Sequence, residues 1–243
     1  MATHNIESFL DAMISVNALS KETYDLWFER FTTVVDPNVA PWDPWLDSDW
    51  RKKPRKVFAD FADYYNDDAW IVQQARMLPS WDALEESPLK SYITTDTRVL
   101  DFGCGPGHSG IPAAQCGAHV TFADISPRLL QGVKALCNAH GIDVATVQVT
   151  EEIQKMDGEF DIIICKDVLE HVKYPIQVLE QLSKVLKKGG VMWMTVFFNG
   201  HELSPYHLPE HYHFDHGTEW LEVAARLGLK PIPGTDRLYR KTR

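Results

Sequence analysis

The sequence predicts an α/β protein with a doubly wound, mostly parallel sheet, preceded by a helical cap. Residues 98–102 form a short apolar run that is typical of a buried strand. A loop with glycines at 103, 105, 107 and 110 follows, and the small residues of 111–116 then suit a helix packed close to the sheet. Residues 119–123 predict a second strand, which ends on Asp124. This order of strand, glycine loop, helix and strand is how nucleotide-binding α/β units begin.

Length, charge and composition limit the domain organisation, the partners and the location that we expect. The chain has 243 residues, enough for one core and an additional cap, and we expect the cap at 1–93 and the ligand-binding domain at 94–243. The net charge of −10, without a long basic cluster, disfavours nucleic acid as a partner. No apolar run approaches the roughly 20 residues of a membrane span, and the N-terminus lacks a secretory pattern, so we expect a cytoplasmic protein away from membranes.

The cysteines point to the same compartment. Cys104, Cys116, Cys137 and Cys165 contain no C-x-x-C pair. We therefore expect small buried residues in a reducing compartment, and neither disulfides nor a zinc site.

The first ninety residues predict helices that carry many aromatic side chains. Apolar residues recur at helical spacing in 1–35 and 56–78, a shorter helix is expected at 81–93, and Ser20 suits an N-cap inside the first segment. Prolines interrupt the aromatic stretch 41–50, which predicts a loop. Six of the eight tryptophans precede residue 82, so the cap either lines a ligand pocket or packs its rings onto the sheet.

The remaining elements alternate as a doubly wound sheet requires. Ser126 and Pro127 are a good N-cap and first residue for a helix that ends at Gly141. The apolar run 160–165 is β-branched, as a strand covered on both faces should be. Further strands are expected at 144–149 and 191–198, helices at 174–186 and 217–228, and a final hairpin from 229–232 and 237–240.

The acid before the glycine loop bears on the ligand. Residues 105–110 fit the G-x-G-x-x-G pattern of dinucleotide binders. However, Asp101 lies at the last turn of the first strand, where it would repel a pyrophosphate and attract an ammonium group. S-adenosylmethionine carries an ammonium group, a ribose and no phosphate, so the two acids favour it over NAD. Asp124 is placed to accept two hydrogen bonds from a ribose diol.

Three motifs carry a resemblance to a known family. V-L-D-F-G-C-G-P-G (99–107), F-D-I-I-I-C-K-D-V-L-E-H-V (160–172) and L-K-K-G-G-V-M-W-M-T (186–195) resemble successive motifs of class I S-adenosylmethionine-dependent methyltransferases. The chain is most similar to the ubiquinone-biosynthesis-like group of small-molecule methylases. The resemblance implies a Rossmann-like, seven-stranded sheet. It also makes F-A-D-Y-Y-N (61–66) similar to the helix that precedes the family's first strand, where Tyr64 or Tyr65 would touch the cofactor.

The resemblance implies a set of cofactor-binding positions. Asp101 would hold the ammonium side, the loop would approach through its backbone, and Asp124 would hold the ribose. Thr150 or Glu151 would replace the family's usual adenine-binding aspartate, or these positions are simply solvated. The full expected set is Asp101, Gly103, Cys104, Gly105, Pro106, Gly107, Asp124, Ile125, Thr150, Glu151, Lys166, Asp167 and Val168.

Histidines are the candidates for catalysis. His171 follows the fourth strand and either accepts a proton from the substrate or starts a helix. Five more histidines (201, 207, 211, 213 and 216) lie within the loop 199–217, which would contact the acceptor. They could form a zinc, iron or manganese site, supply a general base, or simply hold the loop. No known zinc spacing occurs, and prolines at 205 and 209 make His211 and His213 the favoured pair.

These observations predict an S-adenosylmethionine-dependent methyltransferase that acts on an oxygen or nitrogen of a small molecule. The alternatives are an NAD-linked oxidoreductase, a methyltransferase acting on protein or tRNA, and a non-catalytic adenosylmethionine-binding protein. The sequence predicts neither the acceptor nor the oligomeric state.

Overall fold

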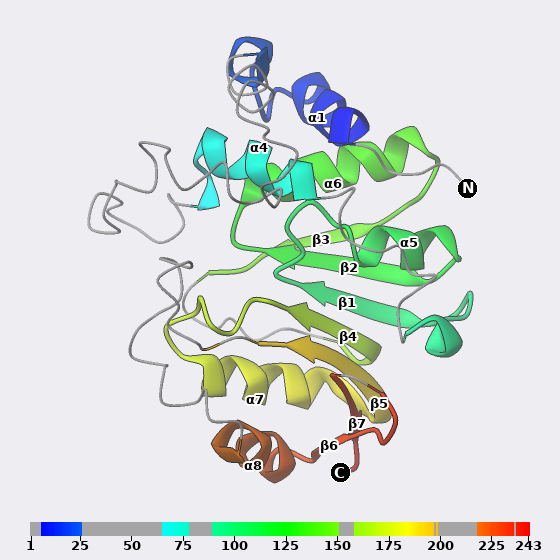
Figure 1. The fold of residues 1–243 in the computed structure, drawn as a ribbon. Coiled ribbons are helices and arrows are strands. Elements are labelled where there is room, and N and C mark those ends of the chain that lie inside the picture. The colour runs from blue at the N-terminus through cyan, green and yellow to red at the C-terminus, as the bar shows by residue number, and fades with distance from the viewer. Residues whose placement is uncertain are drawn as a thin grey trace.

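The structure is a computed structural model that describes residues 6–25, 65–77, 89–150, 158–196, 198, 218–235 and 237–243. A seven-stranded sheet with the strand order β3-β2-β1-β4-β5-β7-β6 runs through it (Figure 1). The strands are β1 (Arg98–Phe102), β2 (His119–Asp124), β3 (Ala145–Gln148), β4 (Phe160–Lys166), β5 (Leu186–Thr195), β6 (Leu229–Pro231) and β7 (Leu238–Lys241). The helices are α1 (Ile6–Ser15), α4 (Asp68–Met77), α5 (Gly110–Gln115), α6 (Pro127–Ala139), α7 (Pro175–Val185) and α8 (Thr218–Arg226), with a 3-10 turn at Lys90–Tyr92.

The direction of the strands confirms the predicted fold class. The strands β3, β2, β1, β4 and β5 pair in parallel, while β7 runs antiparallel to both β5 and β6. The chain winds outward from β1 to β3 and then crosses back to β4 on the other side of β1. Ligands of open α/β sheets bind at this switch point, outside the carboxyl ends of the strands.

Each face of the sheet has its own apolar core, because side chains alternate along a strand. Val99, Phe122 and Ile162 pack under residues of α1, α4, α5 and α6. Leu100 and Ile163 pack on the other face, together with residues of α7 and α8. Asp101 comes two residues after Val99, and Asp124 comes two residues after Phe122, so both acids lie on the same face as α5 and α6.

The N-terminal helices are interrupted within the described residues. The helical segment predicted at 1–35 breaks after α1, where Asn17 adopts a φ of 56°, just before the second helix that the sequence predicts from Ser20. Helical geometry resumes at residues 21–25, and Ser20 caps it as expected, because its Oγ accepts the Thr23 N–H at 3.0 Å. The predicted helix at 56–78 is also wrong at residues 66 and 67, since α4 begins at Asp68. The aromatic loop 41–50, Tyr64 and the start of the helix predicted at 81–93 lie outside the described residues.

Strand β5 begins earlier than predicted, at Leu186 rather than Val191. The sequence places the lead into this strand at 186–190, but Leu186 already pairs with Phe160, and the register shifts between Phe160 and Ile162. A Cβ on Gly190 would lie only 2.8 Å from the Lys187 carbonyl oxygen, so a side chain would not fit there.

The cysteine prediction is correct for three positions. Cys104, Cys137 and Cys165 are buried, and all four thiols are free. Cys116 is exposed instead, because it lies just past the last residue of α5, where the chain turns back toward β2. Within the part of the chain that the structure describes, no helix has the length and apolar character to cross a bilayer.

Candidate functional site

The glycine loop connects β1 to α5 at the carboxyl edge of the sheet. Gly103, Gly105 and Gly107 have φ angles of 66°, 52° and 84°, a region that favours glycine. A Cβ on Gly103 would lie 2.3 Å from Cγ2 of Val168, which follows β4. Val168 therefore packs directly against the loop, so the structure brings together two of the motifs that the sequence singled out.

Asp101 is buried with an unused acceptor. Its side chain is 3% exposed, and among the described residues its Oδ2 has no hydrogen-bond partner. Burial raises the pKa of Asp101 to about 7, against the opposing effects of the Gly110 backbone N–H and the Lys166 ammonium. A Cβ on Gly110 would lie 2.7 Å from this oxygen, so the space around Oδ2 depends on glycine at that position.

Asp124 is buried with each oxygen engaged by backbone. Its Oδ2 accepts the Gly105 N–H and its Oδ1 accepts the Ser126 N–H, both at 2.8 Å. Burial raises the pKa of Asp124, and these N–H groups oppose that rise. A carboxylate oxygen has two lone pairs, so each oxygen keeps one that can accept a hydroxyl of a vicinal diol.

The two acids belong to one site. They lie on the same face of neighbouring strands, and the charge of Asp124 contributes to the raised pKa of Asp101. The glycine loop passes between them, since Gly105 donates to Asp124 and Gly110 borders Asp101. The prediction that both acids face one edge of the sheet therefore agrees with the geometry.

The end of β4 supplies a cation and a constrained turn. Lys166 Nζ lies 4.2 Å from the centroid of the Trp193 ring, and its charge lowers the pKa of Asp101. Asp167 has a φ of 54°, which is rare for a residue with a Cβ. Two hydrogen bonds to Thr195 hold Asp167 in this conformation. The Asp167 N–H donates to the Thr195 carbonyl oxygen at 3.0 Å, and the Thr195 hydroxyl donates to Oδ1 of Asp167 at 2.7 Å.

Three residues near the site were missed by sequence reasoning. His108 is half-buried within the glycine loop, and desolvation of its ring, with a smaller effect of Lys166, lowers its pKa to about 3. Its position is one of the unspecified ones of the G-x-G-x-x-G pattern, so no signal marked it. Thr195 lies inside the strand predicted at 191–198, and the sequence indicated no other role for it. Gln74 of α4 has its Oε1 3.5 Å from the position of a Cβ on Gly105, and no motif connects those two segments.

The other predicted site residues differ in how far they are buried, and some lie outside the described residues. Cys104 is buried in the loop, which raises the pKa of its thiol. Pro106 is buried and Ile125 half-buried, and Thr150 is exposed after β3. His171 is half-buried, and its backbone N–H donates to the Val168 carbonyl oxygen at 2.9 Å. Glu151, His211 and His213 lie outside the described residues. No group of three metal-binding side chains occurs in the described ranges, which exclude the histidine-rich loop.

The donor and acceptor groups fit a ligand with a cation and a diol but no phosphate. Asp101 offers a buried oxygen that lacks a donor, and Asp124 offers two oxygens that are already oriented. The glycine loop lets the backbone approach a ligand closely. A pyrophosphate beside the glycine loop would instead meet the Asp101 carboxylate, so the site fits an adenosyl amino acid better than a dinucleotide.

Comparison with known proteins agrees with this geometry. The model of a methyltransferase domain family matches residues 51–233. A ubiquinone biosynthesis O-methyltransferase of Xanthomonas oryzae pv. oryzae is 33% identical over 105 residues, which are 40% of this chain and 42% of the relative. The protein of the same name from Dechloromonas aromatica is 36% identical over 100 residues, 40% of this chain and 43% of its own. The matched part thus spans less than half the length of these curated relatives.

The fold is also shared with solved structures. A chain of the complex between the Haloferax volcanii Trm112 methyltransferase activator and a methyltransferase superposes with a TM-score of 0.54 and 17% identity, covering 76% of this chain and 100% of that one. A proposed sarcosine dimethylglycine methyltransferase of Galdieria sulphuraria has a TM-score of 0.50 and 19% identity, covering 66% and 63%. At these identities the likeness concerns the fold alone. Because the family match covers most of the chain, the protein belongs to the methyltransferase domain family.

Proposed function

We propose that the protein is an S-adenosylmethionine-dependent methyltransferase that acts on an oxygen or nitrogen of a small molecule. One observation carries the proposal: two buried carboxylates, Asp101 and Asp124, lie on either side of the glycine loop on one face of the sheet. Membership of the methyltransferase domain family supports it. The names of the curated relatives, ubiquinone biosynthesis O-methyltransferases, favour a hydroxyl of a small organic acceptor.

Each part of the site then has a role in binding. Asp101 accepts from the ammonium group, and Asp124 accepts from the ribose hydroxyls. The glycine loop with Cys104 and Pro106 approaches through its backbone, and Lys166, Asp167 and Val168 border the amino acid end. Ile125 and either Thr150 or Glu151 border the adenine.

The cofactor, when bound, supplies a methyl group that is already activated on a sulfonium centre. The chain therefore has to align the acceptor, exclude water and remove the acceptor's proton. His171 is the described candidate for the proton acceptor, because its backbone is bonded to Val168 beside the glycine loop. His211 and His213 stay candidates from the sequence.

Two further parts of the proposal rest on composition, and a third rests on the position of Asp101. The net charge of −10 favours a small molecule over nucleic acid as the acceptor. The unpaired cysteines support a reducing, cytoplasmic location. An NAD-linked oxidoreductase is less well supported, because Asp101 would border the pyrophosphate.

Calorimetric titration of the purified protein with S-adenosylmethionine, S-adenosylhomocysteine and NAD tests the cofactor. We expect binding of the first two and none of NAD, and Asp124→Ala should weaken binding about tenfold or more, since it removes hydrogen bonds to a charged acceptor. Binding of NAD alone would contradict the proposal.

Release of S-adenosylhomocysteine during incubation with hydroxylated and amine-bearing acceptors then tests turnover. For each acceptor that is consumed as S-adenosylhomocysteine is released, the mass of the product shows the added methyl group. The fragments of that product in tandem mass spectrometry show which atom carries it. His171→Gln should slow turnover and leave cofactor binding unchanged. Binding without turnover on any acceptor would favour the non-catalytic alternative.

A further inference from the structure

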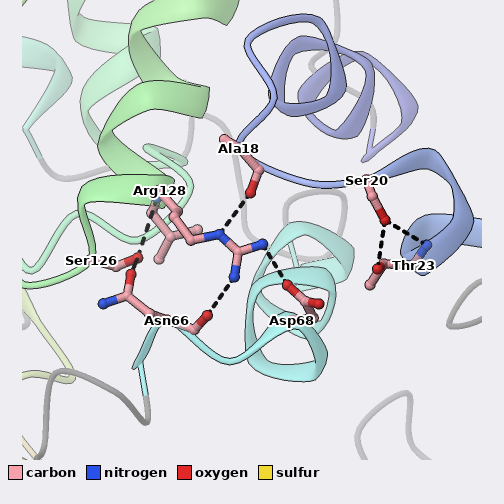
Figure 2. A network of polar contacts seen from close by, with 8 residues as sticks. Ala18, Ser20, Thr23, Asn66, Asp68, Ser126 and Arg128 are labelled. Carbon is pink, nitrogen blue, oxygen red and sulfur yellow. Dashed lines mark hydrogen bonds and ion pairs between the residues drawn. The ribbon is translucent and has the colours of Figure 1, made fainter.

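Figure 2 shows a fork of hydrogen bonds from Arg128 that joins three segments of the chain. Arg128 lies in the first turn of α6, and its Nε donates to the Ala18 carbonyl oxygen at 2.7 Å. Its Nη1 donates to the Asn66 carbonyl oxygen, and its Nη2 forms an ion pair with the Asp68 carboxylate. One guanidinium thus fixes the turn after α1 and the start of α4 to the start of α6.

The fork continues into the candidate cofactor site through Ser126. The Ser126 hydroxyl donates to Oδ1 of Asn66 at 2.8 Å, and the Ser126 N–H donates to Oδ1 of Asp124 at 2.8 Å. Ser126 is fully buried, and its Oγ also accepts the Leu129 N–H as the N-cap of α6. A continuous series of polar contacts therefore leads from Asp124 through Ser126 and Asn66 to Arg128.

Helix α4 reaches the same site at a second point. Asp68, in its first turn, is held by Arg128, while Gln74 lies against Gly105. The Gly105 N–H donates to the other oxygen of Asp124. One carboxylate oxygen of Asp124 is therefore linked to Asp68 of α4 through Ser126, Asn66 and Arg128, and the other is bonded to the part of the glycine loop that Gln74 of α4 approaches.

From this geometry we infer that Arg128 is a positioning residue, which holds Asp124 in place for the nucleoside and couples the docking of α4 to ligand binding. The inference rests on the proposed adenosyl ligand. Coupling is reciprocal, so a ligand bound to Asp124 stabilises α4, and an undocked α4 weakens the binding of that ligand. A guanidinium is suited to this task because its donors lie on three nitrogens in a fixed plane, whereas the three donors of an ammonium group share one nitrogen and rotate.

The test combines calorimetry with hydrogen exchange on the full chain. Arg128→Ala should weaken S-adenosylhomocysteine binding about three- to tenfold, the scale of losing charged hydrogen bonds that act indirectly. Amides of residues 68–77 should exchange faster in this variant, and the protection that the ligand adds to them in the wild type should shrink. Arg128→Lys, which keeps the charge but not the fork, should lie between the wild type and Arg128→Ala in both measurements.

Lys187→Ala is the matched control. Lys187 pairs with Asp161 at 2.7 Å, and the two side chains are 36% and 37% exposed, against 27% and 41% for Arg128 and Asp68. Asp161 lies near the start of β4, at the opposite end of that strand from the site. The control should leave both ligand affinity and exchange in α4 unchanged, although it too loses an ion pair.

The outcomes separate this inference from the proposed function. A wild type that binds neither adenosyl compound overturns both. A wild type that binds, with unchanged affinity in both Arg128 variants, overturns the coupling alone. Ligand binding that leaves exchange in α4 unaltered does the same. If circular dichroism shows that Arg128→Ala does not fold, the ligand affinity and the amide exchange of α4 are measured in Arg128→Lys and Asp68→Asn instead, and unchanged values in both would overturn the coupling.

Discussion

At the scale of single residues, the two acids of the site are buried in different ways. Asp124 has both oxygens bonded to backbone N–H groups, so its charge is partly compensated before any ligand binds. Asp101 keeps a buried oxygen that finds no donor among the described residues. An unsatisfied buried acceptor is costly, and a ligand that brings a cationic donor removes that cost.

The raised pKa of Asp101 predicts pH-dependent binding. Below its pKa of about 7 the carboxyl is neutral, and a cationic ligand must first displace its proton. The affinity for S-adenosylhomocysteine should therefore fall as the pH drops from 7 to 5.5, by up to about tenfold per pH unit. Calorimetry at a series of pH values measures this, and Asp101→Asn should bind more weakly at pH 7 and lose the slope. An equal slope in the variant would assign it to another group.

The same pKa has a consequence for stability without ligand. The folded pKa of Asp101 lies above its value of 3.8 in the unfolded chain, so the folded protein holds this proton more tightly. Its contribution to stability is present in full below pH 3.8 and is lost as the pH rises toward 7. Urea unfolding of the wild type and of Asp101→Asn at pH 5 and pH 8 measures this effect. The free energy of unfolding of the variant, relative to that of the wild type, should be higher at pH 8 than at pH 5.

At the scale of secondary-structure elements, α6 joins the N-terminal helices to the sheet. Its inner residues Leu129, Val133 and Leu136 belong to the core on that face. Its outer side receives α1 at Gly132, where a Cβ would lie 2.6 Å from Met13 Cγ and 2.9 Å from Phe9 Cζ. The missing side chain therefore lets the two helices approach closely.

Replacing Gly132 sets helix propensity against packing. Alanine is the better helix former by about 1 kcal/mol, but overpacking a close contact typically costs about 1–3 kcal/mol. We expect Gly132→Ala to destabilise the protein by about 1 kcal/mol in urea unfolding, because the clash is the larger effect. In a Met13→Ala background the nearest atom is gone, so the same substitution should cost less. An equal cost in both backgrounds would show that Met13 is not the obstacle.

At the scale of the whole molecule, the candidate site gathers the carboxyl edges of β1, β2 and β4, together with α4. A ligand there contacts elements from both halves of the sheet and from the N-terminal region. Because it binds only the folded chain, it stabilises all of them together.

Thermal unfolding should report this directly. At about one hundred times its dissociation constant, a single ligand adds about 2.7 kcal/mol. For a chain of this size that corresponds to a rise in Tm of roughly 5–10 °C. Scanning fluorimetry with S-adenosylhomocysteine should show the rise, whereas NAD should not, and the Asp124→Ala variant should show a smaller rise at the same ligand concentration. A comparable rise with NAD would favour the dinucleotide alternative.

The order of elements and the central motif are determined by the sequence itself. Strand β1 was predicted with its observed bounds, and α6 has the predicted cap, because strand alternation, helical spacing and caps are local patterns. The two acids were predicted for the same reason, since Asp101 is the second-to-last residue of a strand that a glycine loop follows, and Asp124 ends a strand before a helix cap. The start of β5 was not predicted, because a pair of glycines in isolation indicates a turn as well as a bend in a strand.

Only the tertiary structure decided which side chains meet. The Arg128 fork contacts a carbonyl group 110 residues away, and Lys166 acts on His108 across the sheet. No period or motif encodes such contacts, since they depend on how the helices pack over the strands. The raised pKa of Asp101 likewise exists only once Asp101 is withdrawn from water beneath α5, where burial and not residue type sets the pKa.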